Sequence, residues 1–340
     1  MKLMLERIIP NLRIQTIFYN IIIASRGYKI YTSNDFGKTW VFRNSVPVAY
    51  NKYINSNIRI ISRLFRNGIT SILHLFGNRV LICCDREMFL SNLNFDTFER
   101  VNVPTRFFQL LDNNICKTNK FIYYGEYFPN NERGKVNIYS TEDGMDWELI
   151  YSFPKKTIRH IHLLQYDPFS DRIWFSTGDL GEECMLGNAS YDFSDVDIIG
   201  WNNQNWRCVE MLFEREYIYW GTEDPTGNNW ILSLERENYN LNKIIEVNTP
   251  VYNIKKLNNG YILITANERG EWDKKAHVWF TSDLTNYWED SISFEKDKYP
   301  CIFGFGRLFY GCSNIDKVFL TGQALKGLDN STIVLKLQNQ

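Results

Sequence analysis

The segment Ser33-Asn-Asp-Phe-Gly-Lys-Thr-Trp40 is the strongest indication of the fold in this sequence. It fits the pattern S-x-D-x-G-x-T-W. In such a segment the hydroxyl and carboxylate side chains bond nearby backbone N–H groups, the glycine supplies a positive φ, and the tryptophan fills the gap between neighbouring strands. The segment therefore predicts a tight turn between two β-strands. Because its residues have this folding role, none of them is a candidate for catalysis.

Further copies of this turn pattern recur along the chain. Ser140–Trp147 keeps the Ser, Gly and Trp, with Glu142 in the Asp position, and Thr281–Trp288 keeps the Thr, Asp and Trp. Weaker copies begin at Ser91, Ser190 and Ser233. Successive copies start about 58, 49, 50, 43 and 48 residues apart, which is the spacing of β-propeller blades.

The segments between these turns are typical of short strands. They are β-branched and aromatic runs such as RVLICC, RIWFST, YIYWGT and YILITA, and helical periodicity is almost absent. The sequence therefore predicts an all-β propeller of four-stranded antiparallel blades. Six turn patterns and a final unit near the C-terminus favour seven blades, and a six-bladed ring is the alternative. The last strand, TIVLKL, is expected to close the ring against N-terminal strands, and no linker divides residues 1–340, so we predict one domain.

The composition limits the classes of partner. The 340 residues are 44% hydrophobic, which is enough for a large core, and 38 Lys+Arg nearly balance 39 Asp+Glu. No strongly basic face is implied, so we expect no nucleic-acid partner and no membrane insertion. The seven cysteines have neither zinc-site nor disulfide spacing, which indicates reduced thiols. Glu6 and Pro10 interrupt the apolar N-terminal stretch, so we predict a cytoplasmic protein without a signal peptide.

Cations are expected at one mouth of the ring. The innermost strand of each propeller blade lines the channel, and its start lies on the same face as the loop after the second strand. Innermost strands are predicted to begin with Ser62–Arg66, Arg106–Gln109, Ile158–His162, Asn205–Cys208 and Pro250–Tyr252. Arg66, Arg159 and Arg207 are therefore predicted to bind substrate at this mouth.

Carboxylates are expected at the same mouth. The second strands are predicted to end in Asp85–Glu87, Gly125–Tyr127, Thr177–Asp179, Gly221–Asp224 and Asn267–Arg269, and each run contains an acidic residue. Glu126, Asp179 and Asp224 are the catalytic candidates among these residues, and Glu268 is a candidate for substrate binding. A ring in which cations alternate with carboxylates has the groups needed to hold an anionic sugar and to move protons.

Two histidines and a tyrosine complete the predicted site. His160 and His162 alternate by two, so on a strand both side chains point to one face. They are interpreted as core histidines, as proton-transfer groups or as metal ligands; because no third ligand is evident, we predict no cofactor and keep a metal at this pair as the lesser alternative. Tyr127, with Arg133 six residues further on, is a candidate acid/base and carboxylate clamp, and an ion-paired surface loop is the alternative.

The turn pattern is the Asp-box of sialidases, and the central block resembles a family of sialidase-like BNR-repeat proteins. The block runs from YYGEYFPNNERGKVNIYS through IRHIHLLQYDP, RIWFSTGD and QNWR to YIYWGTEDP. The resemblance covers most of the chain, best from Arg63 to about Glu235. It implies a glycosidase-like protein without an established reaction. Sialidases add a YRIP-type motif, from which Arg7-Ile-Ile-Pro10 departs by one extra residue, and three arginines that Arg66, Arg159 and Arg207 would mimic.

Two functions follow from these observations. The first is cleavage of a glycosidic bond in an acidic oligosaccharide or polysaccharide, as a glycoside hydrolase or a polysaccharide lyase. Hydrolysis would use two of Glu126, Asp179 and Asp224, whereas β-elimination would use Tyr127 and His160 with a charge clamp. The alternative is a non-catalytic propeller that binds glycans or supports assembly in a surface-polysaccharide pathway.

Overall fold

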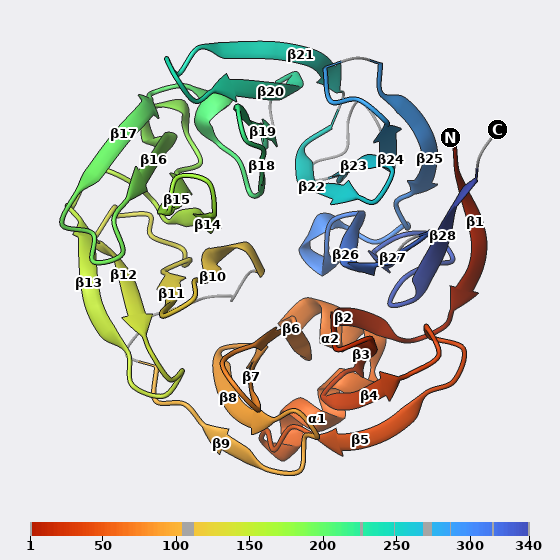
Figure 1. Ribbon diagram of the computed structural model, residues 1–340. Coiled ribbons are helices and arrows are strands. Elements are labelled where there is room, and N and C mark those ends of the chain that lie inside the picture. The colour runs from red at the N-terminus through yellow and green to blue at the C-terminus, as the bar shows by residue number, and fades with distance from the viewer. Residues whose placement is uncertain are drawn as a thin grey trace.

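Seven four-stranded sheets are arranged in a ring (Figure 1). The computed structural model describes residues 2–103, 112–224, 227–247, 249–267, 274–285, 287–314 and 316–338. Neighbouring strands within each sheet are antiparallel. The prediction of a seven-bladed, all-β propeller is therefore confirmed, and the six-bladed alternative is wrong.

The blades follow one another around the ring in chain order. The first four are β2 (Arg13–Phe18), β3 (Ile21–Arg26), β4 (Lys29–Ser33) and β5 (Val41–Ser45); β6 (Ile69–His74), β7 (Arg79–Cys84), β8 (Glu87–Asn92) and β9 (Phe98–Arg100); β10 (Ile115–Lys117), β11 (Ile122–Gly125), β12 (Val136–Thr141) and β13 (Glu148–Phe153); and β14 (Ile161–Asp167), β15 (Arg172–Thr177), β16 (Met185–Ala189) and β17 (Val196–Trp201). The next two are β18 (Met211–Phe213), β19 (Tyr217–Gly221), β20 (Asn229–Glu235) and β21 (Leu241–Val247); and β22 (Val251–Leu257), β23 (Gly260–Thr265), β24 (Lys275–Thr281) and β25 (Glu289–Glu295).

The two ends of the chain share the seventh blade. Its strands are β26 (Arg307–Ser313), β27 (Lys317–Gln323), β28 (Thr332–Gln338) and β1 (Lys2–Ile9). The N-terminal strand pairs antiparallel with β28, from Lys2 opposite Gln338 to Ile9 opposite Thr332. The expected closure is therefore confirmed, and it pairs a strand edge that would otherwise be open.

The hydrophobic cores lie between neighbouring blades. One cluster, for example, joins Ile262 and Val278 of the sixth blade to Leu320 and Leu335 of the seventh, and all four side chains are buried. Both faces of most central strands are consequently covered. This explains the continuous apolar runs of the sequence, since a strand buried on both faces does not alternate with polar residues.

The turns between third and fourth strands use the predicted hydrogen bonds. Ser33 Oγ donates to Asp35 Oδ1 at 2.7 Å, and the same carboxylate oxygen accepts the backbone N–H of Thr39 at 2.9 Å. In the second copy, Thr141 and Asp143 make the equivalent bonds. The alignment that placed Glu142 in the Asp position is therefore wrong, because β12 continues one residue further than that alignment assumed.

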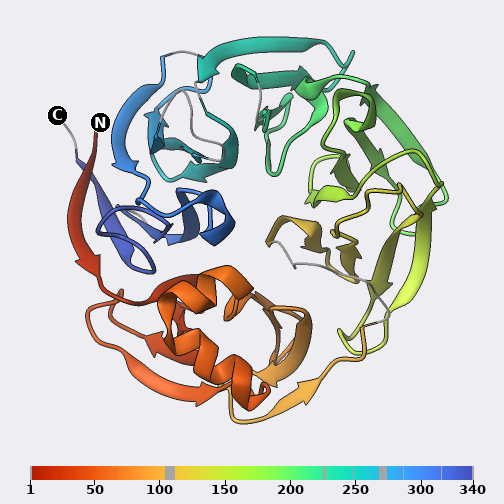
Figure 2. The same cartoon turned by 180° about the vertical axis from the view of Figure 1, so that it is seen from behind.

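A helical hairpin, α1 (Tyr50–Asn57) and α2 (Arg59–Phe65), follows the first blade and flanks one mouth of the channel (Figure 2, orange). The predicted strand starts at Ser62–Arg66 and Asn205–Cys208 are wrong, and Arg106–Gln109 lies outside the described residues. Arg66 caps α2 with φ 55°, and that strand starts at Ile69. Gln204–Trp206 form a 3₁₀ helix, and β18 starts at Met211. An ion pair between Arg63 and Asp297 holds α2 to the ring. Because α1 buries no residue, its sequence has no apolar stripe from which the helix could have been predicted. None of the helices in the described ranges is long and apolar enough to cross a membrane.

The remaining elements are four 3₁₀ helices, counted over the described residues. They are η1 (Asp112–Asn114), η2 (Gly181–Glu183), η3 (Gln204–Trp206) and η4 (Cys301–Phe303). Asn113 of η1 and Cys301 of η4 line the central cavity, whereas η2 begins two residues after the lining residue Asp179 and η3 ends immediately before the lining residue Arg207.

Candidate functional site

One mouth of the channel contains a cavity of about 430 Å³. Basic side chains outnumber acidic ones in its lining. Among the described residues, the basic ones are Arg13, Arg26, Arg59, Arg63, Arg66, Arg159, Arg207, Lys255 and Arg307, and the acidic ones are Asp179, Glu210 and Glu223. Although the whole chain is close to neutral, this cavity therefore favours an anionic ligand.

A repeated β-bulge supplies side chains to the cavity. In the innermost strands β2, β6, β14 and β22, one residue near the start has no partner on the adjacent strand; these residues are Gln15, Thr70, His162 and Tyr252. Each follows a buried Ile or Val. A bulge redirects a side chain relative to the regular alternation of a strand, and His162 is one of three such residues that line the cavity.

A glycine turn positions Asp179. Gly178 has φ 84°, and a Cβ atom on it would lie 2.2 Å from the carbonyl oxygen of Glu183. The N–H of Gly178 donates to the carbonyl of His160 at 3.1 Å, and Thr177 Oγ1 donates to the Glu183 carbonyl at 2.9 Å. Only glycine fits this close approach, so the turn after β15 fixes the distance between Asp179 and the histidines.

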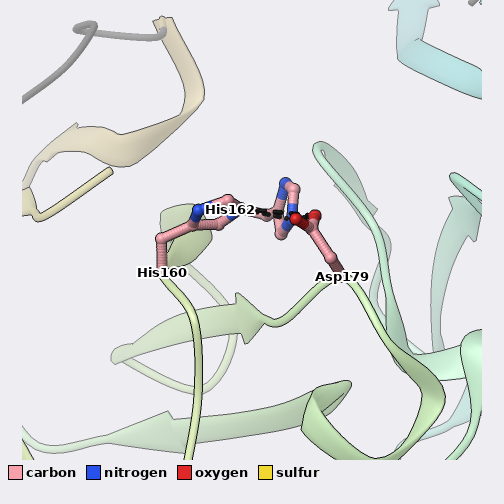
Figure 3. A group of neighbouring side chains, drawn as sticks. All are labelled: His160, His162 and Asp179. Atoms are coloured by element: carbon pink, nitrogen blue, oxygen red, sulfur yellow. Dashed lines mark hydrogen bonds and ion pairs between the residues drawn. The ribbon is translucent and has the colours of Figure 1, made fainter. Parts of the chain in front are cut away.

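His160, His162 and Asp179 converge on one point of the cavity wall (Figure 3). The two Nε2 atoms are 3.1 Å apart, and Asp179 Oδ1 lies 3.1 Å from Nε2 of His162 and 3.3 Å from Nε2 of His160. Both histidines are buried, and Asp179 is partly exposed. Among the described residues, these three form a group whose ligand atoms could hold a metal ion.

The Nδ1 atom of each imidazole also faces an oxygen atom. His160 Nδ1 lies 3.3 Å from the carbonyl oxygen of Phe128, and His162 Nδ1 lies 3.4 Å from Glu223 Oε2. The second distance is within ion-pair range but lacks hydrogen-bond geometry. The tautomer sets the role of each Nε2 atom: an Nε2–H donates to Asp179 Oδ1, whereas a proton on Nδ1, directed toward these oxygens, leaves Nε2 as an acceptor.

Two arginines surround Asp179. Arg159 Nη1 lies 2.6 Å from Oδ2, and Arg207 Nη2 lies 3.3 Å from Oδ1. Arg207 also bonds Glu223 Oε2 through Nε at 3.1 Å, and both of these side chains are at most 5% exposed. Arg207 therefore connects the two carboxylates that lie closest to the histidines.

The environment keeps Asp179 ionised and His160 neutral. Burial by itself would raise the pKa of Asp179, but hydrogen bonding to His160 and His162 holds that pKa far below its usual range. Burial lowers the pKa of His160 below its ordinary value, although Asp179 acts in the opposite direction. A neutral imidazole and a carboxylate are the protonation states in which these groups bind cations.

Tyr127 packs against the histidines within the cavity. Its ring centroid is 4.1 Å from that of His160, with a tilt of 37°, and 5.7 Å from that of His162 in an edge-on arrangement. Tyr127 follows β11, whereas in the next blade His160 immediately precedes β14 and His162 is its second residue. The site is thus assembled between two blades.

The structure brings seven of the residues that the sequence singled out together in the cavity lining. They are Arg66, Tyr127, Arg159, His160, His162, Asp179 and Arg207. Glu126 lies next to this group but is fully buried, and its Oε2 accepts the N–H of Asn137 at 2.9 Å. Its carbonyl accepts the N–H of Ile161, so Glu126 connects β11 to the strand that carries the histidines.

Arg133 and Asp224 lie outside the lining of this cavity. Arg133 pairs with Glu183, whose Oε1 is 2.5 Å from its Nε, and so connects two loops behind Asp179. The backbone of Asp224 is bonded to the side chain of Asn229. Glu268 falls outside the residues that the structure describes.

Glu223 was not among the predicted site residues, although the run Gly221–Asp224 that contains it was selected. Asp179 is the second residue after the end of β15, and Glu223 is likewise the second residue after β19, so the register of the neighbouring blade would have identified it. Arg13 and Arg307 were also missed. Their guanidinium carbons each lie 4.1 Å from the ring centroid of Phe309. The contact of Arg13 is between two blades and leaves no local pattern, whereas Arg307 and Phe309 lie two residues apart on β26.

Comparisons with known proteins identify the fold. No protein-family model matches the chain, so its resemblance to sialidase-like BNR-repeat proteins stays a prediction. No curated protein matches its sequence either.

Solved structures resemble the chain in shape at low sequence identity. An oligogalacturonate lyase in complex with manganese superposes with a TM-score of 0.65 at 7% identity, over 96% of this chain and 89% of the lyase. The extracellular domain of the one-component system BT4673 from B. thetaiotaomicron superposes with a TM-score of 0.60 at 10% identity. The superposition covers 100% of this chain, which spans only 40% of the length of that domain. YCF48 bound to a D1 peptide gives 0.59 at 10% identity, over 99% and 95% of the two chains. Likeness at this identity shows a shared propeller fold and nothing about activity.

Proposed function

We propose that the protein binds an acidic oligosaccharide or polysaccharide in its central cavity and cleaves it by β-elimination next to a uronate. The observation that carries the proposal is the packing of Tyr127 on His160 in a cavity whose lining is rich in arginine. Elimination from a uronate requires a neutralised carboxylate and a group that transfers a proton at the adjacent carbon.

The arginines supply the binding part. Guanidinium groups bind carboxylates through paired N–H donors. Arg66, Arg159 and Arg207 line the cavity, and Arg159 and Arg207 contact Asp179. Asp179 and Glu223 neutralise part of this charge, but basic side chains still outnumber acidic ones in the lining, which favours a ligand with several carboxylates over a neutral sugar.

Tyr127 is assigned the proton transfer. In the elimination, the bond between carbon 5 of the uronate and its hydrogen breaks, a double bond forms between carbons 4 and 5, and the glycosidic oxygen leaves carbon 4 and takes up a proton. A tyrosine accepts the first proton as phenolate and delivers a proton to the leaving oxygen as phenol. His160 packs against the ring of Tyr127 and so limits its orientations.

Hydrolysis is less well supported. It requires one carboxyl group that is protonated at neutral pH, whereas the pKa of Asp179 is held far below its usual range. Glu126 is fully buried, and Asp224 lies away from the cavity lining.

Two further arguments agree with the proposal. The fold also occurs in an oligogalacturonate lyase, and the Asp-box resemblance connects the chain to sialidase-like proteins. We also propose a cytoplasmic location. The proton transfers described above use only protein side chains.

The test is a screen of the purified protein with uronate-containing, sialylated and neutral oligosaccharides. Thermal shift reports binding, and ultraviolet absorbance reports the unsaturated product of elimination. We expect both signals with a uronate-containing sugar, and we expect Tyr127→Phe to lose the product while the thermal shift remains. New reducing ends without absorbance would indicate hydrolysis instead. Binding without product would make the propeller a glycan-binding platform and would refute cleavage.

A further inference from the structure

We propose that His160, His162 and Asp179 bind one divalent transition-metal ion at the wall of the central cavity. The inference does not depend on glycan cleavage, because it follows from the three side chains and their surroundings. It assigns a role to a pair of histidines that the elimination itself uses only as support for Tyr127.

The first argument is the meeting of three acceptor atoms. If Phe128 and Glu223 hold a proton on each Nδ1, the lone pairs of both Nε2 atoms are directed toward the same region as Asp179 Oδ1. Three acceptors within 3.3 Å of one another repel each other unless a positive charge lies among them. A metal ion satisfies all three at once, whereas a shared proton satisfies only two.

The second argument is the size of the triangle. With sides of 3.1, 3.1 and 3.3 Å, its centre lies about 1.8 Å from each corner, so an ion about 1 Å out of the plane would bond all three atoms at about 2.1 Å. That is the usual bond length to histidine nitrogen and carboxylate oxygen. The ligands come from the start of β14 and from the glycine turn after β15, and the β-bulge at His162 and Gly178 fix both segments.

The third argument is the support of the ligands. Histidines that bind metal usually donate their other N–H to a carboxylate or a backbone carbonyl, which fixes the ring and its tautomer. Here the Phe128 carbonyl lies 3.3 Å from Nδ1 of His160, and the Glu223 carboxylate lies 3.4 Å from Nδ1 of His162, within ion-pair range but without hydrogen-bond geometry. Glu223 is in turn held by Arg207.

The donor set indicates the class of metal. Two imidazoles and one carboxylate are typical of manganese, iron, cobalt, nickel or zinc, whereas magnesium and calcium prefer oxygen ligands throughout. Two histidines and one carboxylate on one face of a metal leave further coordination positions open. All three ligands line the cavity, so these positions face the space in which an anionic ligand would bind.

The nearby arginines predict cooperation with an anion. Arg159 and Arg207 offset the charges of Asp179 and Glu223, so the two charges of the metal ion remain to be balanced from the cavity. A uronate carboxylate would balance them, and each ligand should then strengthen the binding of the other. This coupling, unlike the metal site itself, rests on the proposed function.

The experiment measures metal binding directly. The full chain is stripped with a chelator and dialysed, and Mn²⁺, Co²⁺, Ni²⁺, Zn²⁺, Mg²⁺ or Ca²⁺ is added; calorimetry, elemental analysis and thermal shift then give affinity, stoichiometry and stabilisation. We expect one equivalent of a transition metal, with a higher melting temperature, and weaker binding of Mg²⁺ and Ca²⁺. His160→Gln and Asp179→Asn should each lower the affinity at least tenfold, since even supporting residues contribute that much.

A matched control separates this site from histidine binding in general. His277 pairs with Asp290 at 2.7 Å on the sixth blade, outside the cavity lining, so His277→Gln should bind metal like the wild type. Absence of a stoichiometric transition metal in the wild-type protein would overturn the proposal without recourse to any variant. Equal affinity of wild type and folded Asp179→Asn would overturn it as well. Metal binding without glycan cleavage would leave the site intact and refute only the proposed function.

Discussion

Replacement of Arg207 by Leu should destabilise the protein strongly, because this arginine holds two carboxylates in the wall of the cavity. Its side chain is 4% exposed and lies 3.1 Å from Glu223 Oε2 and 3.3 Å from Asp179 Oδ1. It also donates to the backbone carbonyl of Asp179 at 3.1 Å. Leucine fills part of the volume but removes the charge and all of these donors.

The magnitude follows from the burial of the partners. Asp179 retains Arg159 at 2.6 Å, so the main loss falls on Glu223, whose side chain is 5% exposed. Removal of one partner from a buried ion pair costs about 3–5 kcal/mol, because the remaining charge has lost its counterion. Glu223→Gln in the same chain removes that charge, so the double variant should recover roughly 1–3 kcal/mol relative to Arg207→Leu alone.

Arg172→Leu is the matched control. Arg172 likewise contacts two carboxylates, Asp195 at 2.7 Å and Asp197 at 3.1 Å, but these partners are 64% and 58% exposed. The free energy of unfolding of this variant should fall by about 1 kcal/mol, mostly through loss of the hydrogen bond from Arg172 Nε to buried Asn188, because the exposed ion pairs contribute little. Urea denaturation followed by circular dichroism and tryptophan fluorescence compares the variants. If Arg207→Leu were within 1 kcal/mol of Arg172→Leu, or if Glu223→Gln made it less stable still, the reasoning would be refuted.

Three other perturbations test neighbouring parts of the argument. Gly178→Ala should weaken metal or acidic-glycan binding at least tenfold, since its Cβ would displace the turn that carries Asp179, whereas Gly77→Ala, with a φ of 61° and open space around it, should cost only backbone strain. Burial would raise the pKa of Asp297, but Arg63 lowers it; the stabilisation is therefore full above the unfolded pKa and is lost as the pH falls through the folded one. Thermal melts of Asp297→Asn should accordingly show a lower melting temperature than the wild type at pH 7 and a smaller gap below about pH 4, and a constant gap would contradict this assignment. Binding of an acidic oligosaccharide should weaken as salt rises, because the cavity acts through its charge, and calorimetry at two salt concentrations would show an unchanged affinity if that account were wrong.

The turn chemistry made most of the fold predictable. The bonds of Ser33, Asp35 and Thr39 are local, so their spacing in the sequence reports the turn directly, and the interval between copies reports the blade. The helix α2 escaped prediction because a distant ion pair, that of Arg63 with Asp297, holds it in place. Local periodicity carries no information about a partner more than 200 residues away.

The cavity was predictable in type but not in detail. Blade symmetry placed Arg159, His160, Asp179 and Arg207 at one mouth, since equivalent positions in a repeat occupy equivalent places around the channel. It did not distinguish Glu223 from Asp224, because the choice depends on how far the chain runs past β19 before it turns. An error of one residue at such a point selects a side chain of different direction.

Short strands, recurring turns and a repeat of blade length were enough to predict the ring, because they leave few other ways to bury so many apolar residues. The meeting of Asp179 with the two histidines is a property of the folded chain alone. Their convergence depends on a β-bulge at His162, on a positive φ at Gly178 and on hydrogen bonds between the ends of two strands. Each of these features changes the distance between side chains. A sequence pattern specifies which face of a strand a residue takes, not the distance between two side chains.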